Sequence, residues 1–237
     1  MKLTADEIFN SLKNEFHFEN ATGKITFNLR DYSIVVEQNN VVGNILEEWL
    51  AKWFNSKGYD NIHNLKQDAP DFWLNPDDLK SEWLEIKSFT GSPNFDIANF
   101  RSYINEIIEK PYKLHSKYLL IKYKAENGIV TIEDFWLKNV WDISCPSNSW
   151  PVKVQVKRGI IYNLRPSTWY SEETSYPSFK SLEHFLAAIE QTMYRYHDTN
   201  VLAETWLDKV KKSYKKHYGK VLNIPRWFDI KKEYGIE

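Results

Sequence analysis

Hydrophobic and polar positions repeat along this chain with two periods, which predict a mixture of helices and strands. Apolar residues between positions 42 and 53 recur every three or four residues, as in a helix with one buried face, and Gly58 is suited to end that helix. A shorter amphipathic helix is expected over residues 4–15. Thr4 and Glu7 form the capping-box pattern at its start.

The strand period appears in the segments around these helices. Residues 24–30 and 32–37 predict a hairpin. Further strands are expected at residues 60–65, 71–74, 82–89, 117–124, 131–144, 150–164 and 167–171, and further helices at residues 95–111, 181–196 and 201–220. The pattern therefore predicts a mixed α/β protein, with added strands and helices in its C-terminal part.

Composition favours a folded protein of the cell interior. The chain has 237 residues, 42% of them hydrophobic, which suits a single domain over residues 1–237 with a sizeable core. Cys145 is the only cysteine, so an internal disulfide is excluded and a reducing compartment is expected. The sequence contains no apolar stretch long enough to span a bilayer and no leader-like N-terminus. A cytoplasmic location is expected.

Three charged side chains stand in otherwise apolar strand patterns. In residues 82–89 the side chains alternate, so Trp83, Glu85 and Lys87 point to one face of the strand. If residues 71–74 pair with this strand, Asp71 reaches the same surface. Two carboxylates and an ammonium group would then converge.

Such a set suits metal-assisted cleavage of a phosphodiester bond. Mg²⁺ prefers oxygen ligands, which Asp71, Glu85 and the backbone carbonyl of Ile86 could supply. Lys87 could position water or neutralise charge that grows on the phosphate. The competing interpretation is a solvated strand face with a surface Glu–Lys pair.

Residues 41–124 resemble the PD-(D/E)XK nuclease core, with Pro70–Asp71 as the PD and Glu85, Ile86 and Lys87 as the E-x-K. The resemblance implies an α/β core with a mixed central sheet flanked by helices. Its order is a helix, a three-stranded meander, a crossing helix and a further strand, with Mg²⁺ bound at the Asp and the Glu. It also implies an acidic residue from the first helix. Glu47 matches the spacing from Gly43, and Glu48 is the alternative.

Segments over nearly the whole chain are similar to the NgoBV/NlaIV type of type II restriction endonuclease, including "VVGNILEEWL", "PDFWLN", "DFWLKNVWDI" and "RPSTWYS". The resemblance implies a Mg²⁺-dependent enzyme that cleaves double-stranded DNA at GGNNCC. Because that site is a palindrome, a homodimer is expected, with one active site for each strand. DNA recognition and dimerisation would fall to residues 1–40 and 125–237.

Two basic segments are candidates for DNA contact. In residues 150–164, the polar side chains alternate with valines and are followed by arginines, and Arg or Lys can bond guanine in the major groove. The helix at 201–220 is rich in lysine, which suits phosphate contact. The candidates are Lys153, Gln155, Lys157, Arg158, Arg165, Lys211 and Lys215. Solvated surfaces are the alternative for both segments.

The sequence shows little support for other kinds of catalytic or cofactor-binding site. The six histidines lack zinc-site spacing, and no phosphate-binding glycine loop is present, so no nucleotide cofactor is expected. Two rivals to a restriction enzyme stay open: a repair or structure-specific nuclease with the same core, and a DNA-binding protein with a decayed site. Discrete fragments of phage DNA would separate these possibilities.

Overall fold

The computed structural model describes residues 1–37, 41–66 and 68–237. Contacts between residues divide the chain into two compact units. Unit 1 comprises Met1–Ser92 and Ser116–Lys138, and unit 2 comprises Pro93–His115 and Asn139–Glu237. The single domain expected from chain length stays a prediction.

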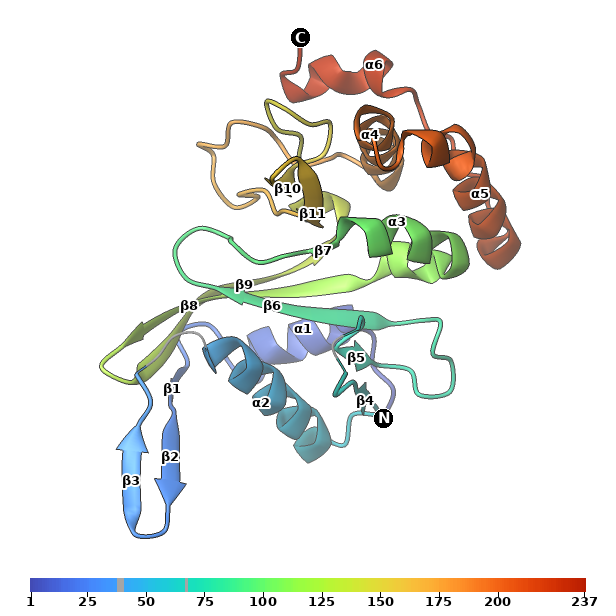
Figure 1. The fold of residues 1–237 in the computed structure, drawn as a ribbon. Helices are drawn as coiled ribbons and strands as arrows, with labels where there is room; N and C mark the ends of the chain where they lie inside the picture. The colour runs from blue at the N-terminus through green and yellow to red at the C-terminus, as the bar shows by residue number, and fades with distance from the viewer. Residues whose placement is uncertain (38–40, 67) are drawn as a thin grey trace. The chain divides into compact units, whose positions relative to one another are not determined.

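Unit 1 is built on a six-stranded mixed sheet with the strand order β1-β9-β8-β6-β5-β4. The central strands β6 and β8 are parallel, whereas β4, β5 and β6 form an antiparallel meander. In Figure 1 the helices α1 and α2 lie on the same side of this sheet. The elements are α1 (Ala5–Asn14), β1 (Thr22–Lys24), β2 (Thr26–Leu29), β3 (Tyr32–Val35), α2 (Val42–Lys57), β4 (Ile62–His63), β5 (Phe72–Trp73), β6 (Trp83–Phe89), β8 (Lys117–Glu126) and β9 (Ile129–Asn139).

The predicted helices of unit 1 are confirmed together with their end signals. At the start of α1, the Thr4 side chain accepts a hydrogen bond from the backbone of Glu7, and the Glu7 carboxylate accepts one from the Thr4 backbone. The helix α2 ends at Gly58, which adopts a left-handed conformation with φ of 69°. Glycine takes this conformation without the steric cost of a Cβ.

The core of unit 1 lies between α1, α2 and the sheet. Leu12, Leu50, Phe54 and Phe72 are fully buried there, and Ile121 from β8 joins them. Burial of an aliphatic or aromatic side chain of this size contributes about 1.5–3 kcal/mol. The apolar faces that the sequence pattern predicts for α1 and α2 therefore hold both helices on the sheet.

Unit 2 combines helices with a small sheet ordered β10-β11-β7. Its core includes Tyr103, Phe185 and Trp206, and the Trp206 indole donates a hydrogen bond to the carbonyl of Ile104 at 2.7 Å. The elements are β7 (Ala98–Asn99), α3 (Phe100–Glu109), β10 (Val154–Lys157), β11 (Ile160–Leu164), α4 (Leu182–Arg195), α5 (Asn200–Tyr218), α6 (Trp227–Ile230) and the 3-10 helices Pro111–His115, Trp141–Ile143 and Lys231–Tyr234.

Several sequence predictions need correction. The strand expected over 131–144 ends at Asn139 and is followed by the 3-10 helix Trp141–Ile143. The segment expected as strand over 150–164 is a hairpin of β10 and β11 with its turn at residues 158–159. Residues 167–171 form no strand, because the chain turns there and the Ser171 N–H donates to the Thr168 carbonyl at 2.9 Å. The helix expected from residue 95 begins at Phe100, where the Asn99 side chain caps it. The strand expected over 24–30 is divided, since residues 22–24 pair with β9 and residues 26–29 pair with β3.

Candidate active site

Asp71 lies directly before β5, in a position that brings it against the middle of β6. The ladder between these strands pairs Phe72 with Leu84 and ends one residue short of Asp71 and Glu85. The Asp71 carboxylate accepts a hydrogen bond from the backbone N–H of Ile86 at 2.6 Å. Asp71 is thereby fixed beside the E-x-K segment.

Glu85 and Lys87 share one face of β6, as strand alternation predicts. The Lys87 ammonium donates to the Glu85 carboxylate at 3.3 Å. Glu85 is only 5% exposed, and the Lys87 side chain is 23% exposed. A buried, paired carboxylate of this kind differs from a solvated surface pair, which costs little to form and contributes little.

The charge on Lys87 is stabilised by several carboxylates together. Burial on its own lowers the pKa of Lys87, but the nearby charges of Glu85 and Asp71, and more weakly Glu47, outweigh burial and raise that pKa above its ordinary value. Lys87 is therefore an ammonium ion at neutral pH. The charges of Glu85, Asp71 and Glu47 thus all act on the same ammonium group.

Glu47 reaches this group from α2. Its carboxylate lies 2.9 Å from the His63 imidazole. Burial raises the pKa of Glu47, the hydrogen bond with His63 opposes that change, and the charge of Asp71 adds to it. The neighbouring Glu48 is exposed to solvent. Of the two glutamates that the sequence leaves open, Glu47 is the one beside Asp71 and Lys87.

Glycine at position 43 lets α2 lie close to β6. A Cβ added to Gly43 would meet the Ser88 hydroxyl at 3.0 Å, closer than nearly all real Cβ contacts. Gly43 is one helical turn before Glu47, and Ser88 follows Lys87. The close approach therefore sets the distance between the glutamate on the helix and the charged residues on the strand.

Two supporting residues, His63 and Asn64, were not predicted from the sequence. His63 pairs with Phe72 in the β4–β5 ladder and stacks on its ring. The Asn64 side chain donates to the carbonyls of Asp68 and Pro70, and its backbone N–H donates to the Asp71 carbonyl at 2.8 Å. The sequence offered one signal for Asn64, which is its place in the short segment 60–65 expected as a strand. An amide that becomes buried there needs hydrogen-bond partners.

The residues predicted to contact DNA from β10 and its surroundings divide into two groups. Lys153 donates to the Pro166 carbonyl at 2.9 Å, and Arg165 pairs with Asp96 and donates to the Asn94 carbonyl. These two side chains are committed to contacts within unit 2. Gln155 lies 3.4 Å from Asn163, also within hydrogen-bonding distance.

The outward side chains of this hairpin are Lys157 and Arg158. Lys157 is exposed and lies over the Tyr162 ring, and Arg158 occupies the turn with φ of 53°. The ladder shifts register between Gln155 and Val156, and Val156 is 39% exposed. The strict separation of polar and valine faces expected for this strand is therefore wrong beyond Gln155.

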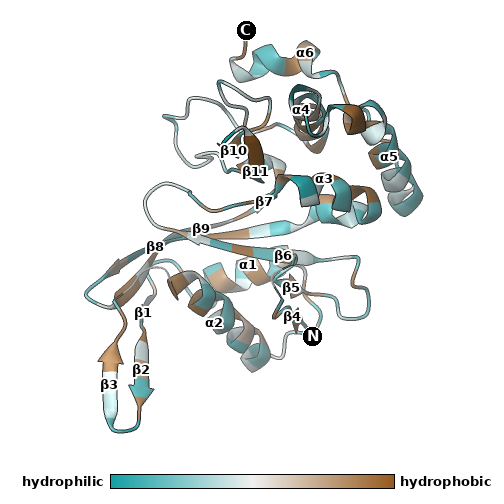
Figure 2. Ribbon diagram, viewed as in Figure 1, coloured by the Kyte–Doolittle hydropathy of each residue, from teal (hydrophilic) through white to brown (hydrophobic). Residues whose placement is uncertain are grey.

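The lysines predicted on α5 differ in exposure. Lys215 is exposed in the last turn, whereas Lys211 is half-buried, and its charge opposes the rise that burial causes in the pKa of Glu190. Figure 2 shows hydrophilic positions along much of α5, with apolar positions between them. The buried positions of this helix are Ala203, Trp206, Val210 and Tyr214.

The described residues contain no group of three or more His, Cys, Asp or Glu side chains spaced to hold a metal ion. The charges of Asp71, Glu85 and Glu47 nevertheless all act on Lys87, and carboxylate oxygens are the ligands that a hard divalent cation prefers. Across residues 1–37, 41–66 and 68–237, no helix combines the length and apolar character that a membrane span requires.

The mixed α/β fold, with Asp71 directly before β5 and with Glu85 and Lys87 on the neighbouring β6, is the arrangement expected of a nuclease. The family model of the NgoBV restriction endonuclease matches residues 2–234. The chain belongs to the NgoBV restriction endonuclease family and is a type II restriction endonuclease.

Individual relatives agree with this assignment. The type II restriction enzyme NlaIV of Neisseria lactamica is 43% identical over 99% of this chain and 98% of its own length. The type II restriction enzyme NgoBV of Neisseria gonorrhoeae is 38% identical over 67% of this chain and 92% of its own. The solved NlaIV restriction endonuclease structure matches with a TM-score of 0.95, covering 99% of this chain and 97% of that one.

Proposed function

We propose that this chain is a Mg²⁺-dependent enzyme that hydrolyses double-stranded DNA at a short palindromic site, for which the family likeness implies GGNNCC. It acts as a homodimer in the cytoplasm, with one active site for each strand. The observation that carries the proposal is the convergence of Asp71, Glu85 and Glu47 around Lys87.

Asp71 and Glu85 are the proposed metal ligands, joined by the backbone carbonyl of Ile86 and assisted by Glu47. The residues present fit Mg²⁺, because the ion favours carboxylate and carbonyl oxygens and leaves room for phosphate oxygens. When bound, it supplies polarisation of the phosphoryl group and lowers the pKa of a coordinated water.

Lys87 is proposed to act as a fixed positive charge. Since its neighbours raise its pKa above the ordinary value, it holds its proton at neutral pH and is unsuited to accept one. A preorganised ammonium can stabilise negative charge that develops on the scissile phosphate without rearrangement. Its pairing with Glu85 at 3.3 Å holds the ammonium in place before DNA arrives.

His63 and Asn64 are proposed to position the carboxylates. His63 fixes the Glu47 side chain through the 2.9 Å contact, and Asn64 ties the backbone at Pro70 and Asp71. Loss of a group that orients a metal ligand in this way typically costs about 10–100-fold in metal affinity or activity. Neither residue needs to touch DNA for this role.

Lys157, Arg158 and Lys215 are the proposed DNA contacts that are most available for binding, because they are exposed. Lys153, Gln155, Arg165 and Lys211 would first have to exchange an internal partner or neighbour. Lysines at exposed positions suit phosphate contacts that set register, whereas Arg158 could read a base edge.

The proposal is tested by incubating the protein with Mg²⁺ and phage DNA. Discrete, reproducible fragments with common end sequences are expected, and a smear or no cleavage would overturn it. Lys87→Ala should reduce cleavage at least about 100-fold but retain specific DNA binding in Ca²⁺. Lys80→Ala, which removes an exposed lysine outside the site, is the matched control.

A further inference from the structure

The hairpin formed by β2 and β3 carries an apolar face that the described chain leaves open. The register pairs Phe27 with Ile34 and Leu29 with Tyr32, and residues paired directly across a ladder point to the same side. Their exposed fractions are 54% for Phe27, 63% for Leu29, 81% for Tyr32 and 59% for Ile34.

The opposite side of this hairpin is polar. Asn28 pairs with Ser33 between the two apolar pairs, so these two side chains point away from the apolar face. Figure 2 shows hydrophobic positions interspersed with polar ones along the hairpin. Such alternation is typical of a sheet with one buried and one solvated face.

Within the described residues, β2 and β3 form a two-stranded sheet of their own. A two-stranded hairpin is at best marginally stable in water unless its apolar face packs against something. Its base is well held, because Val36 donates to the Ile25 carbonyl at 2.9 Å and Val35 lies beside Gly128. Beyond this base, the apolar residues of the hairpin are exposed, as in a surface that binds a partner.

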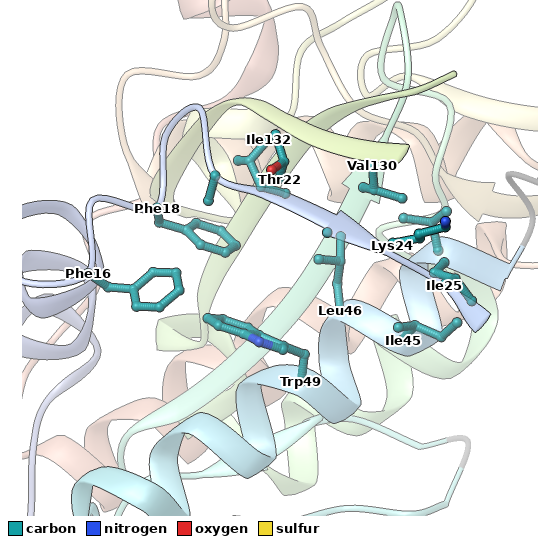
Figure 3. A pocket seen from close by; sticks show the side chains of 13 residues that line it. Phe16, Phe18, Thr22, Lys24, Ile25, Ile45, Leu46, Trp49, Val130 and Ile132 are labelled. Carbon is teal, nitrogen blue, oxygen red and sulfur yellow. The ribbon is translucent and has the colours of Figure 1, made fainter. Parts of the chain in front are cut away.

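The same unit also contains an apolar pocket next to the start of the hairpin. Its lining includes Phe16, Ile25, Ile45, Leu46 and Trp49, which Figure 3 shows gathered around the opening. Phe16 and Ile45 are 39% and 38% exposed. Unit 1 therefore contains both the exposed apolar face of the hairpin and an apolar pocket.

We propose that a second copy of this chain covers the hairpin, with the apolar face of each hairpin seated in the apolar pocket of the other copy. A two-fold arrangement makes such a contact twice, because each copy gives the hairpin and receives one. The inference rests on the proposed homodimer and deepens it. It names the surfaces that would join the two copies.

The exposed area is sufficient for a specific contact. From their exposed fractions, Phe27 and Tyr32 alone leave roughly 250 Å² open on each hairpin. Two hairpins and the two surfaces that receive them would bury on the order of 1,000 Å², the lower range of specific interfaces. Leu29 and Ile34 add to this area.

The chemistry favours a protein partner over DNA at this face. The four residues of the face contain no lysine or arginine, which contact with phosphate requires. The formal net charge of the chain is only -1, so repulsion between two copies is weak. An apolar face opposite an apolar recess is what hydrophobic association needs.

The test compares substitutions on the two faces of the same hairpin by sedimentation velocity. Wild-type protein should be dimeric at micromolar concentration. Leu29→Glu, on the apolar face, should raise the dissociation constant at least roughly 100-fold, because it would bury an unpaired charge. Asn28→Glu, on the polar face of the same strand, should leave the dimer intact. Equal dissociation constants for the two variants, or a monomeric wild type, would overturn the inference.

The pocket is tested in the same way with Ile45→Glu. This variant should also weaken association at least roughly 100-fold, whereas Val201→Glu, which changes an exposed aliphatic residue of unit 2, should not. If Ile45→Glu stays fully dimeric, the pocket does not receive the hairpin and the proposal fails. Circular dichroism of each variant checks that the fold is retained.

Failure of this inference can be distinguished from failure of the proposed function. If the wild type cuts phage DNA into discrete fragments and all four variants are equally dimeric, the nuclease assignment stands and the hairpin interface is refuted. If Leu29→Glu and Ile45→Glu become monomers while the wild type never cuts DNA, the interface stands and the proposed activity is refuted.

Discussion

The Asp71 carboxylate accepts a hydrogen bond from the backbone N–H of Ile86 at 2.6 Å, so an acid that precedes one strand is anchored on the centre of the next. The contact places Asp71 next to the residue between Glu85 and Lys87. It also means that the position of Asp71 and the charge of Asp71 can be examined separately, because an amide oxygen can accept the same hydrogen bond.

Asp71→Asn should therefore abolish activity with little effect on folding. Cleavage of DNA in Mg²⁺ is expected to fall at least about 100-fold, since the proposed metal ligand loses its charge. The free energy of unfolding in urea should change by less than about 1 kcal/mol, because the hydrogen bond with Ile86 can persist. Cleavage at wild-type rate would contradict the assignment of Asp71.

Glu47 and Glu48 provide a matched pair of variants on one helix. Glu47→Gln should lower the cleavage rate, because its carboxylate lies among Asp71, Lys87 and His63. Glu48→Gln should cut as the wild type does, because Glu48 is exposed to solvent. Rates measured under single-turnover conditions compare the two directly. The reverse order of effects would assign the helix acid to Glu48.

A substitution of Asn64 tests whether this residue positions Asp71 without touching DNA. Asn64→Ala removes two donated hydrogen bonds from a buried position and should destabilise the protein by roughly 1–3 kcal/mol. It should also raise the Mg²⁺ concentration needed for half-maximal cleavage, as loosened Asp71 holds the ion less well. Asn61→Ala, three residues earlier, should leave this metal dependence unchanged.

Glu190 on α4 should make the stability of unit 2 depend on pH. Burial raises its pKa, the charge of Lys211 opposes this, and that of Asp208 adds to it. A carboxyl whose pKa is raised by folding favours the folded state below its unfolded pKa, and this contribution is lost as pH rises through the folded pKa. Glu190→Gln should therefore gain stability over the wild type between about pH 4 and pH 7. If the difference in unfolding free energy between Glu190→Gln and the wild type is the same at both pH values, this prediction is contradicted.

Cys145 should be nearly inert in the folded protein. Burial raises the pKa of its thiol to about 11, although the charge of Lys153 opposes the change. At pH 8 the thiolate fraction is then roughly 100-fold lower than for a thiol with an ordinary pKa. Reaction with a disulfide reagent should be slow in buffer and fast in urea. Equal rates would show that the thiol is accessible.

Much of the fold could be predicted because its signals are local. The helix α2 is marked by apolar spacing and by Gly58, and α1 by the Thr4–Glu7 capping box. Clear turn signals separate the strands β5 and β6 in the sequence. Within β6, strand alternation alone places Glu85 and Lys87 on one face. These helices and strands could be predicted because local hydrophobic periodicity is the main sequence signal of secondary structure.

The features that were missed depend on contacts between distant residues. The interaction of His63 with Glu47 requires the exact approach of α2 to β4, which no local pattern encodes. Arg165 appeared available for DNA, yet its partner Asp96 is 69 residues away in sequence. The segment 167–171 was misjudged for a local reason: its aromatic residues resembled a strand, but the Ser171 N–H donates to the Thr168 carbonyl and closes a turn.

The two units exchange the polypeptide three times, after Ser92, after His115 and after Lys138. The parallel neighbours β6 and β8 are consequently separated in sequence by a segment that folds as part of the other unit. No single peptide bond can be cut to release either unit as one continuous fragment. A cut at any one of these crossings leaves at least one unit divided between two fragments, so no single truncation yields one complete unit without part of the other.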